Sequence, residues 1–391
     1  MWLMDLTSHF DVFVMVSVYH VCRKVRDFMY YSQRWKTKTK QTEDDRMKAL
    51  VKYAPGPGNM EIREVPVPVP GPGQVLIEIC EAGICGSDLH IYHSDIAIPM
   101  RPPVITGHEF SGVVSAVGEG VRAYHPGDRV VSETAFSSCG VCSQCRDGFY
   151  NLCDERRTLG YWYDGVFAQF TVVPAARVLH IPEGVSNTAA AMAEPLACVV
   201  HAIDDCSRIR PGDRVLVSGP GSIGLMALQV ARAAGAEVLV SGTAVDAGRL
   251  DMALALGAAR VVCVPGEDLA AAVRDFTGGT GVDAVLECSG AARAIDAALP
   301  LVKKRGCFTQ IGLPGKKIEF DIEKVCYREL KFSGSLGSRR DSWIRALALT
   351  ASGAVRLEQL VTSRRPITEW QAAFEDFESK AGIKQFLMPV G

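Results

Sequence analysis

Alternation of apolar and polar positions in the part of the chain that follows residue 46 predicts β-strands. The segment 75–82 reads Val-Leu-Ile-Glu-Ile-Cys-Glu-Ala, which fits a half-buried strand. Gly-rich turns separate the apolar runs, and the Pro-rich stretch 66–72 cannot sit inside a sheet. The strands predicted here are 49–53, 75–82, 110–117 and 129–132. We expect a compact, mostly antiparallel β domain.

The pattern changes near Asn187, where helical spacing begins to alternate with short apolar strands. Predicted helices are 189–202, 222–234, 247–256, 342–351 and 367–379. Predicted strands are 214–218, 236–241, 259–264, 284–288, 307–311, 360–363 and 385–390. Strands that alternate with helices indicate a parallel sheet with crossover helices. The sequence therefore predicts an α/β protein with a mostly-β domain and a doubly wound parallel sheet.

The composition allows two globular domains and excludes some partners. The chain has 391 residues, is 48% hydrophobic and carries a formal net charge of −2. A charge this small gives no electrostatic reason to expect nucleic acid as a partner. The 13 Cys are odd in number, and several stand singly in apolar runs, where a thiol behaves as a small hydrophobe. We expect a reducing, cytoplasmic compartment.

Residues 1–46 differ from the rest of the chain. The apolar run 12–21 is too short to span a bilayer, and the basic residues follow it instead of preceding it, unlike a signal peptide. A well-formed start of a domain lies at Met47. We interpret residues 1–46 as an N-terminal extension of unknown role, from an upstream extension or a misplaced start codon; a targeting or membrane-peripheral helix is the alternative. We expect no membrane partner.

Four closely spaced cysteines predict a closed metal site. Cys139, Cys142, Cys145 and Cys153 lie within 15 residues, and four thiolates are what a structural, tetrahedral zinc requires. Such a site leaves no position open for substrate. We predict that this zinc stabilises a loop.

A second group of candidate ligands has the composition of an open zinc site. Cys85 precedes Ser87 and His90, and His108-Glu109 follows in a Gly-rich segment. Cys85, His108 and Glu109 can supply three zinc ligands and leave one position for water or substrate. Glu194 is a fourth candidate, either as a direct ligand or as a group that holds the zinc-bound water. Each residue alone has an ordinary structural role as its alternative.

Ser87 and His90 complete the chemistry that an alcohol oxidation needs, because a proton must leave along with the hydride. Zinc lowers the pKa of a bound hydroxyl. Ser87 can take the proton and pass it to His90, whose ordinary pKa is near neutral. A turn residue and a surface histidine are the structural alternatives for this pair.

A glycine fingerprint follows the predicted strand 214–218 and opens the predicted helix 222–234. The motif Gly219-Pro-Gly221-Ser222-Ile223-Gly224 is G-x-G-x-x-G in the context that a dinucleotide requires. Gly219 allows the tight turn, Gly221 allows close approach of the pyrophosphate and Gly224 allows close helix–strand packing. The N-terminus of the helix then faces the phosphates.

The choice between NAD and NADP stays open in the sequence. NAD-binding folds place an acid near the end of the second strand for the ribose hydroxyls, but this strand ends Ser241-Gly-Thr243. The nearest acid is Asp246. Loss of the acid removes repulsion against a 2′-phosphate, which Ser241, Thr243 and Arg249 could then bind.

Taken together, these motifs resemble the zinc-dependent branch of the medium-chain dehydrogenase/reductase superfamily, from Met47 to the C-terminus. Glu194, where a third Cys ligand would otherwise stand, is similar to the sorbitol (L-iditol) and L-threonine 3-dehydrogenase group. The resemblance implies a GroES-like catalytic domain split by an inserted Rossmann domain. The implied bounds are 47–196 with 338–391 for the catalytic domain and 197–337 for the Rossmann domain.

The resemblance also implies one catalytic and one structural zinc, a homodimer or homotetramer, and hydride transfer between a secondary alcohol and NAD or NADP. A polyol, sugar alcohol or amino alcohol is the expected substrate, and a threonine-type 3-dehydrogenase is the alternative. A non-enzymatic nucleotide-binding protein on the same fold is a third reading, but the ligands and the relay are all present. Arg339 and Arg340 could contact an anionic group of the substrate or could be solvated surface charges.

Overall fold

The computed structural model describes residues 46–390. The prediction made for residues 1–46 therefore lies outside the described residues, apart from Arg46. Residues 48–63 and the chain from Pro68 onward form one compact unit. None of the helices within the described chain combines the length and the apolar character that crossing a bilayer requires.

The first part of the chain forms mostly antiparallel β structure, as predicted. A three-stranded sheet has the order β2 (Met60–Pro66), β1 (Arg46–Lys52), β4 (Val104–Ile105). A seven-stranded sheet has the order β10 (Val178–His180), β6 (Arg129–Ser132), β5 (Glu109–Val117), β3 (Gln74–Gly83), β18 (Lys384–Met388), β17 (Val361–Pro366), and β9 (Phe170–Pro174) also pairs with β3. The C-terminal strands β17 and β18 add one parallel pair to this sheet. A separate pair consists of β7 (Ala135–Ser137) and β8 (Arg157–Thr158).

Pairing of β3 with β5 brings the predicted metal ligands together. The antiparallel register places Gly83 opposite Glu109, and Cys85 follows two residues later. A side chain at Gly83 would meet the Glu109 carboxylate, because its Cβ would stand 2.6 Å from Oε2. The sheet thus sets the spacing between the segment that carries Cys85 and the segment that carries His108 and Glu109.

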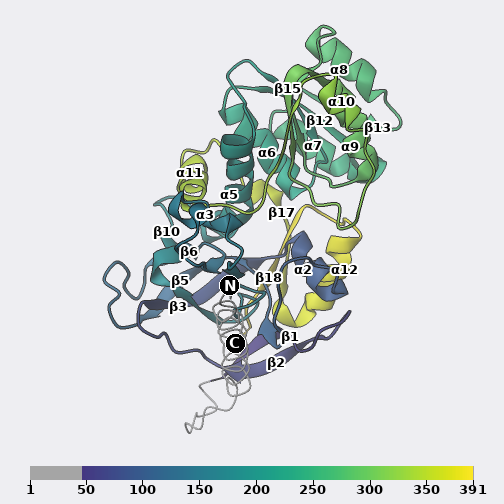
Figure 1. The fold of residues 1–391 in the computed structure, drawn as a ribbon. Coiled ribbons are helices and arrows are strands. Elements are labelled where there is room, and N and C mark those ends of the chain that lie inside the picture. The colour runs from purple at the N-terminus through teal and green to yellow at the C-terminus, as the bar shows by residue number, and fades with distance from the viewer. Residues whose placement is uncertain (1–45, 391) are drawn as a thin grey trace, which may run out of the picture. The chain divides into compact units, whose positions relative to one another are not determined.

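The second part of the chain is a six-stranded parallel sheet (Figure 1). Its strand order is β13 (Arg260–Val264), β12 (Glu237–Thr243), β11 (Arg214–Ser218), β14 (Val282–Glu287), β15 (Val302–Gln310), β16 (Lys331–Gly334). In chain order this is 3-2-1-4-5-6, the order of dinucleotide-binding sheets, and the order in which strands join the sheet reverses beside β11. The helices of this part are α6 (Ser222–Ala233), α7 (Ala247–Ala255), α8 (Leu269–Thr277), α9 (Ala292–Ala298) and α10 (Glu323–Cys326).

The predicted single helix 189–202 is wrong in detail, since two helices cover it. They are α4 (Asn187–Ala190), which the Ser186 side chain caps, and α5 (Ala193–His201). Pro195 stands in the first turn of α5, where a missing backbone N–H costs no helical hydrogen bond. The predicted domain boundary at 196/197 falls inside α5.

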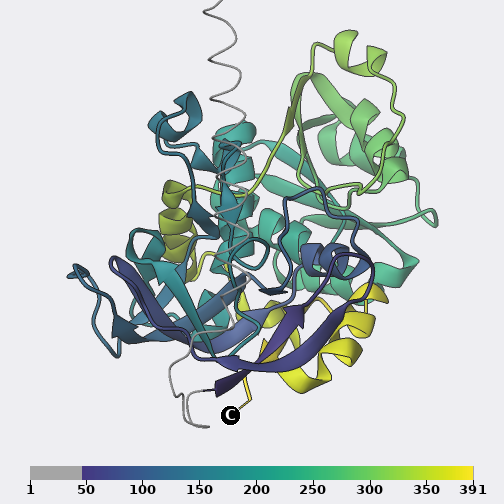
Figure 2. The ribbon, with the colours of Figure 1, turned by 60° about the horizontal axis from the view of Figure 1, so that its bottom comes forward.

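The remaining helices flank these sheets. They are α2 (Gly86–His93), α3 (Ser143–Arg146), α11 (Arg340–Ala351) and α12 (Trp370–Glu378). Short 3₁₀ turns lie at Tyr150–Leu152, Ala175–Arg177, Ala244–Asp246, Leu299–Leu301, Glu358–Leu360 and Ile367–Glu369, and a π-helical turn spans Ala202–Cys206. Figure 2 shows the C-terminal segment, in yellow, back among strands of the first part, where β18 pairs with β3.

The core lies in three apolar clusters. One fills the β part around residues such as Ile77 and Phe167. A second joins α5, α6 and α11 to the parallel sheet, and a third covers the opposite side of that sheet. The packing of α5 against α6 and α11 fixes the position of Glu194 in the first turn of α5.

Candidate active site

The four predicted structural ligands come together in one loop. Sulfur atoms of Cys139, Cys142, Cys145 and Cys153 all lie within 4.8 Å of one another. Backbone N–H groups of Val141 and Cys142 lower the pKa of Cys139 to about 6. At Cys142 the N–H of Cys145 acts in the same direction, but desolvation and the neighbouring thiols raise its pKa to about 11. Four adjacent thiolates need a cation between them, so this donor set fits zinc.

The predicted catalytic ligands form a second cluster. Donor atoms of Cys85, His108 and Glu109 lie within 4.8 Å of one another, with His108 and Glu109 buried. A thiol, an imidazole and a carboxylate that converge in this way fit an open zinc site.

Asp88 orients this cluster, and the sequence reading did not include it. Cys85 is the N-cap of α2, and its backbone N–H donates to Asp88 Oδ2 at 2.8 Å. Asp88 Oδ1 and His108 Nδ1 are buried without a hydrogen-bond partner and lie 3.8 Å apart. Burial raises the pKa of Asp88 to about 6, although His108 opposes the shift. The position of an acid at N3 of a helix could have indicated its capping role.

The groups around His108 raise its pKa. Burial acts to lower its pKa, but a hydrogen bond with Cys85 and the charge of Asp88 outweigh burial and raise the pKa to about 10. A metal ligand needs the neutral imidazole, so metal binding here is coupled to proton release.

Lys384 contacts Glu109, and the sequence reading also missed it. The two side chains form a buried ion pair, each about 1% exposed. The Lys384 ammonium also donates to the Ile84 carbonyl at 2.7 Å. Lys384 stands on β18, some 275 positions from Glu109, and no local pattern links residues so distant. The ion pair holds the carboxylate beside Cys85 and His108.

Glu194 lies near this cluster but outside the group of converging ligand atoms. It is buried, and its Oε1 accepts a hydrogen bond from the Cys198 thiol at 3.5 Å. Burial raises the pKa of Glu194, while His108 acts to lower it. This placement fits the second of its two predicted roles, a carboxylate beyond the direct ligands.

Ser87 has a partner that was not predicted. The hydroxyl of Tyr161 donates to Ser87 Oγ at 2.7 Å, and the Tyr161 ring lies 5.4 Å from the His108 ring. Burial raises the pKa of Tyr161 well above its usual value, so the phenol stays protonated. His90 stands one turn after Ser87 with its side chain 38% exposed and bonded to Asp95 at 2.9 Å. The described chain has no direct Ser87–His90 hydrogen bond.

The glycine loop has the geometry that a pyrophosphate needs. Gly219 has a φ of +96°, and its N–H donates to the Ser241 carbonyl at 2.9 Å. A Cβ at Gly224 would stand 1.9 Å from the Gly219 carbonyl oxygen, so the helix packs against the turn only with glycine there. Around Gly221 a Cβ would meet open space. Ser222 begins α6, and Ile223 packs against the core. The loop fits a dinucleotide.

The side chains predicted to lie near the ribose of the cofactor bond partly to one another. Asp246 accepts from the Thr243 N–H and hydroxyl and pairs with Arg249 at 3.1 Å. Arg249 also donates to the carbonyls of Lys380 and Gly382. Burial opposes ionisation of Asp246, but the Thr243 hydrogen bonds and Arg249 outweigh it and lower its pKa. Its carboxylate is therefore not free for a ribose.

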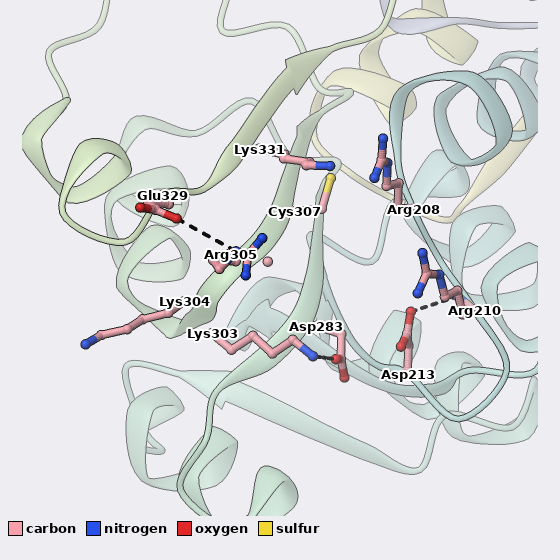
Figure 3. A pocket seen from close by; sticks show the side chains of 11 residues that line it. Arg208, Arg210, Asp213, Asp283, Lys303, Lys304, Arg305, Cys307, Glu329 and Lys331 are labelled. Atoms are coloured by element: carbon pink, nitrogen blue, oxygen red, sulfur yellow. Dashed lines mark hydrogen bonds and ion pairs between the residues drawn. The ribbon is translucent and has the colours of Figure 1, made fainter.

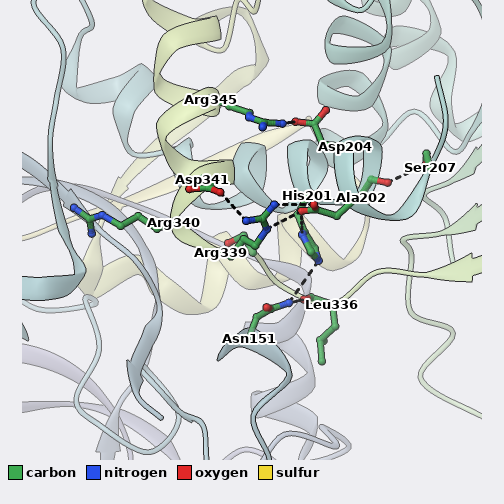
Figure 4. Close-up of polar contacts among 12 residues, drawn as sticks. Asn151, His201, Ala202, Asp204, Ser207, Leu336, Arg339, Arg340, Asp341 and Arg345 are labelled. Carbon is green, nitrogen blue, oxygen red and sulfur yellow. Dashed lines mark hydrogen bonds and ion pairs between the residues drawn. The ribbon is translucent and has the colours of Figure 1, made fainter. Parts of the chain in front are cut away.

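Arg339 and Arg340 have structural roles. Arg339 binds Asp205 through two hydrogen bonds of 3.0 and 2.8 Å, and His201 binds the same carboxylate (Figure 4). Arg340 binds Glu133 at 3.0 Å and nearby carbonyls. The idea that either side chain receives an anionic substrate group is not supported, because both guanidinium groups are occupied.

A cavity of about 510 Å³ lies away from the metal ligands (Figure 3). It opens where β11, β14, β15 and β16 begin, so it lies at the other edge of the parallel sheet from the glycine loop, which follows the end of β11. Lys303 pairs with Asp283 and Arg305 with Glu329 at its rim. We assign the cavity no part in the active site.

Comparison with known proteins agrees with both parts of the candidate site, the metal ligands and the glycine loop. Residues 71–183 match the family described as alcohol dehydrogenase GroES-like domain, and residues 222–352 match the zinc-binding dehydrogenase family. A sorbitol dehydrogenase from Halalkalibacterium halodurans is 42% identical over 88% of this chain and 100% of its own length. The chain belongs to the zinc-dependent medium-chain dehydrogenase family.

Two further similar proteins extend this assignment. The D-arabitol-phosphate dehydrogenase of Enterococcus avium is 41% identical over 84% of this chain and 94% of its own length. A zinc-binding dehydrogenase from Sinorhizobium meliloti, solved with NADP, has a TM-score of 0.81 and 34% identity and covers 89% of this chain and 100% of its own. The predicted GroES-like and Rossmann fold is confirmed, and the protein is a zinc-dependent alcohol dehydrogenase that uses a nicotinamide cofactor.

Proposed function

We propose that this enzyme reversibly oxidises a secondary hydroxyl of a polyol, a sugar alcohol or a related amino alcohol. The observation that carries the proposal is the convergence of Cys85, His108 and Glu109 within 4.8 Å, with the Ser87 hydroxyl two residues after the first of these ligands. The polyol dehydrogenases among the similar proteins support the substrate class.

We assign Cys85, His108 and Glu109 as ligands of the catalytic zinc, and Cys139, Cys142, Cys145 and Cys153 as ligands of the structural zinc. Bound zinc supplies a Lewis acid that makes a substrate hydroxyl more acidic. Glu194 would hold a water molecule or the substrate hydroxyl beside these ligands.

Ser87 accepts the hydroxyl proton and hands on its own proton, and Tyr161 fixes the direction of its lone pairs by donating to Oγ at 2.7 Å. His90, one turn further and partly exposed, carries the proton to solvent. The two side chains share no hydrogen bond, so this step of the proposed relay requires a further proton carrier between them.

Gly219, Gly221, Ser222, Ile223 and Gly224 cradle the pyrophosphate of the cofactor, whose nicotinamide ring accepts the hydride. We propose that the enzyme accepts NADP in preference to NAD. The end of β12 carries no acid to repel a 2′-phosphate, and Asp246 is neutralised by Arg249. Ser241 and Thr243 remain predicted contacts of that phosphate, whereas Arg249 would have to give up its bonds to Asp246 and to the carbonyls of Lys380 and Gly382 to join them.

A threonine-type 3-dehydrogenase is the second candidate, because the same metal site would serve it. The homodimer or homotetramer, the cytoplasmic location and the domain bounds 47–196 with 338–391 and 197–337 stay predictions.

The test combines metal counting with turnover. Purified enzyme is assayed with a panel of polyols and threonine, with NAD and NADP in parallel, and zinc is measured per chain. We expect two zinc ions in the wild type, one in Cys85→Ala with turnover abolished, and one in Cys142→Ala with lower thermal stability. Cys326→Ser is the control, since Cys326 is an exposed free thiol. Full turnover by Cys85→Ala would overturn the assignment of the catalytic site.

A further inference from the structure

Arg156 stands at the edge of the proposed active site on a fixed backbone. It follows Cys153, the last ligand of the structural cluster, and its N–H donates to the Cys153 carbonyl at 2.9 Å. The next residue begins β8. The loop that carries the four clustered cysteines therefore fixes the position of the Arg156 backbone.

The guanidinium of Arg156 lacks an anionic partner. Across residues 46–390, its side chain takes part in no hydrogen bond and no ion pair, although it is partly buried. Its neighbours differ: Arg177 and Arg340 pair with Glu133, and Arg339 pairs with Asp205. Burial lowers the pKa of Arg156, but a guanidinium keeps its charge at neutral pH. A partly buried charge without a partner is unfavourable, so a ligand that supplies an anionic group would be stabilised there.

Arg156 lies within electrostatic range of groups of the proposed active site. The groups whose charges act on it are Cys198, Tyr161, Glu194 and Cys153. Of these, Tyr161 bonds to Ser87, and Cys198 bonds to Glu194. Nη1 lies 3.1 Å from the place where a Cβ on Gly337 would stand, so the guanidinium fills the space that this glycine leaves. The charge thus lies among the groups that we assign to proton transfer and to the open metal position.

We propose that Arg156 binds an anionic group on the substrate, a phosphate monoester or a carboxylate, and so directs the enzyme to charged secondary alcohols. A planar guanidinium offers two parallel N–H donors that match two oxygens of such a group. Arg339 and Arg340 cannot take this role, because carboxylates of the protein already hold them. The inference rests on the proposed function and narrows its substrate class.

The test compares matched substrates that differ only in the anionic group. Zinc-loaded enzyme is assayed with D-arabitol, D-arabitol phosphate and D-arabinonate, and kcat/KM is measured for the wild type, Arg156→Ala, Arg156→Lys and Arg157→Ala. We expect the wild type to prefer one charged substrate, and Arg156→Ala to lower that preference roughly 10- to 150-fold. Arg156→Lys should restore part of it.

Arg157→Ala is the control, because Arg157 stacks on Trp162 and donates only to backbone carbonyls of Asp154 and Arg156. It should keep the wild-type preference. Preference for the phosphate identifies a phosphorylated polyol, and preference for the aldonate identifies a hydroxy acid.

A wild type that favours the neutral polyol would overturn the inference and leave the proposed function standing. An equal loss by Arg156→Ala on all three substrates would also overturn it, since Arg156 would then act only by supporting Glu194. If no substrate turns over, the proposed function fails, and calorimetric binding of D-arabitol phosphate to the wild type and Arg156→Ala still decides the inference. Equal affinity for the two proteins would overturn it.

Discussion

Tyr161 donates a hydrogen bond of 2.7 Å to Ser87 across 74 positions of sequence. The phenol lies buried beside His108, in a setting that keeps it protonated. A donor that never ionises at working pH fixes the Ser87 hydroxyl in one orientation. The proposed relay thus begins with a pair that neither residue's local sequence indicates.

We therefore predict that Tyr161→Phe lowers kcat roughly 2- to 10-fold, because Ser87 loses the hydrogen bond that orients it. Ser87→Ala should lower kcat more, and the double variant should fall no further than Ser87→Ala alone. Steady-state kinetics between pH 6 and 10 checks this. Additive losses in the double variant would show that Tyr161 acts independently of Ser87.

Lys384→Met should destabilise the metal-free protein strongly, because the Glu109 carboxylate would remain buried without its cation. Loss of one partner of a buried pair costs about 3–5 kcal/mol of the free energy of unfolding. Zinc should reduce the loss, since a second cation then stands beside Glu109. Thermal melting with and without zinc tests this, and Glu109→Gln/Lys384→Met should recover part of the stability. An unchanged melting temperature of metal-free Lys384→Met would contradict the prediction.

Ala244→Asp should move the cofactor preference toward NAD. Ala244 is exposed and is the first residue after β12, where a carboxylate would repel a 2′-phosphate and accept from the ribose hydroxyls. We expect kcat/KM with NADP relative to NAD to fall about tenfold or more. Ala244→Asn, which has nearly the same shape without the charge, is the control. A similar shift in both variants would show that shape and not charge sets the preference.

Arg339→Gln should lower the stability of the protein at neutral pH and make its stability depend less on acid. The Arg339 hydrogen bonds are the main cause that lowers the pKa of Asp205, with His201 assisting. A carboxyl group with a lowered pKa in the folded state contributes stability that is present above its unfolded pKa, near 3.9. That stability is lost as the pH falls through the folded pKa.

Without Arg339 the pKa of Asp205 rises toward its unfolded value, so the deficit in melting temperature relative to the wild type should be largest near pH 7 and should shrink as the pH falls toward 3. Arg345→Gln is the matched control, because it removes the neighbouring exposed pair with Asp204. An acid profile of Arg339→Gln that coincides with that of the control would rule out this role for Asp205.

The sequence by itself determined the features that depend on neighbouring residues. Period-two and helical patterns gave most strands of both sheets, because burial of one face imposes them locally, but they missed β9, β10 and β16. The four-Cys loop and the glycine turn were predicted because every residue needed for them lies within a short segment. The ends of helices were not predicted as well. The predicted helix 189–202 divides near Ala191, because packing and not periodicity determines where one helix ends and the next begins.

Only the tertiary structure decided the partners that come from distant segments. Lys384 reaches Glu109 because β18 pairs with β3, and Tyr161 reaches Ser87 because the segment after β8 lies beside α2. Carboxylates of the protein pair with Arg339 and Arg340, whereas Arg156 has no such partner. Which arginine is paired depends on the carboxylates that the fold brings near it. The pattern of residues along the chain indicates which positions are buried and which form turns. A contact between two charged side chains depends instead on the distance between them in the folded protein, which the arrangement of the sheets determines.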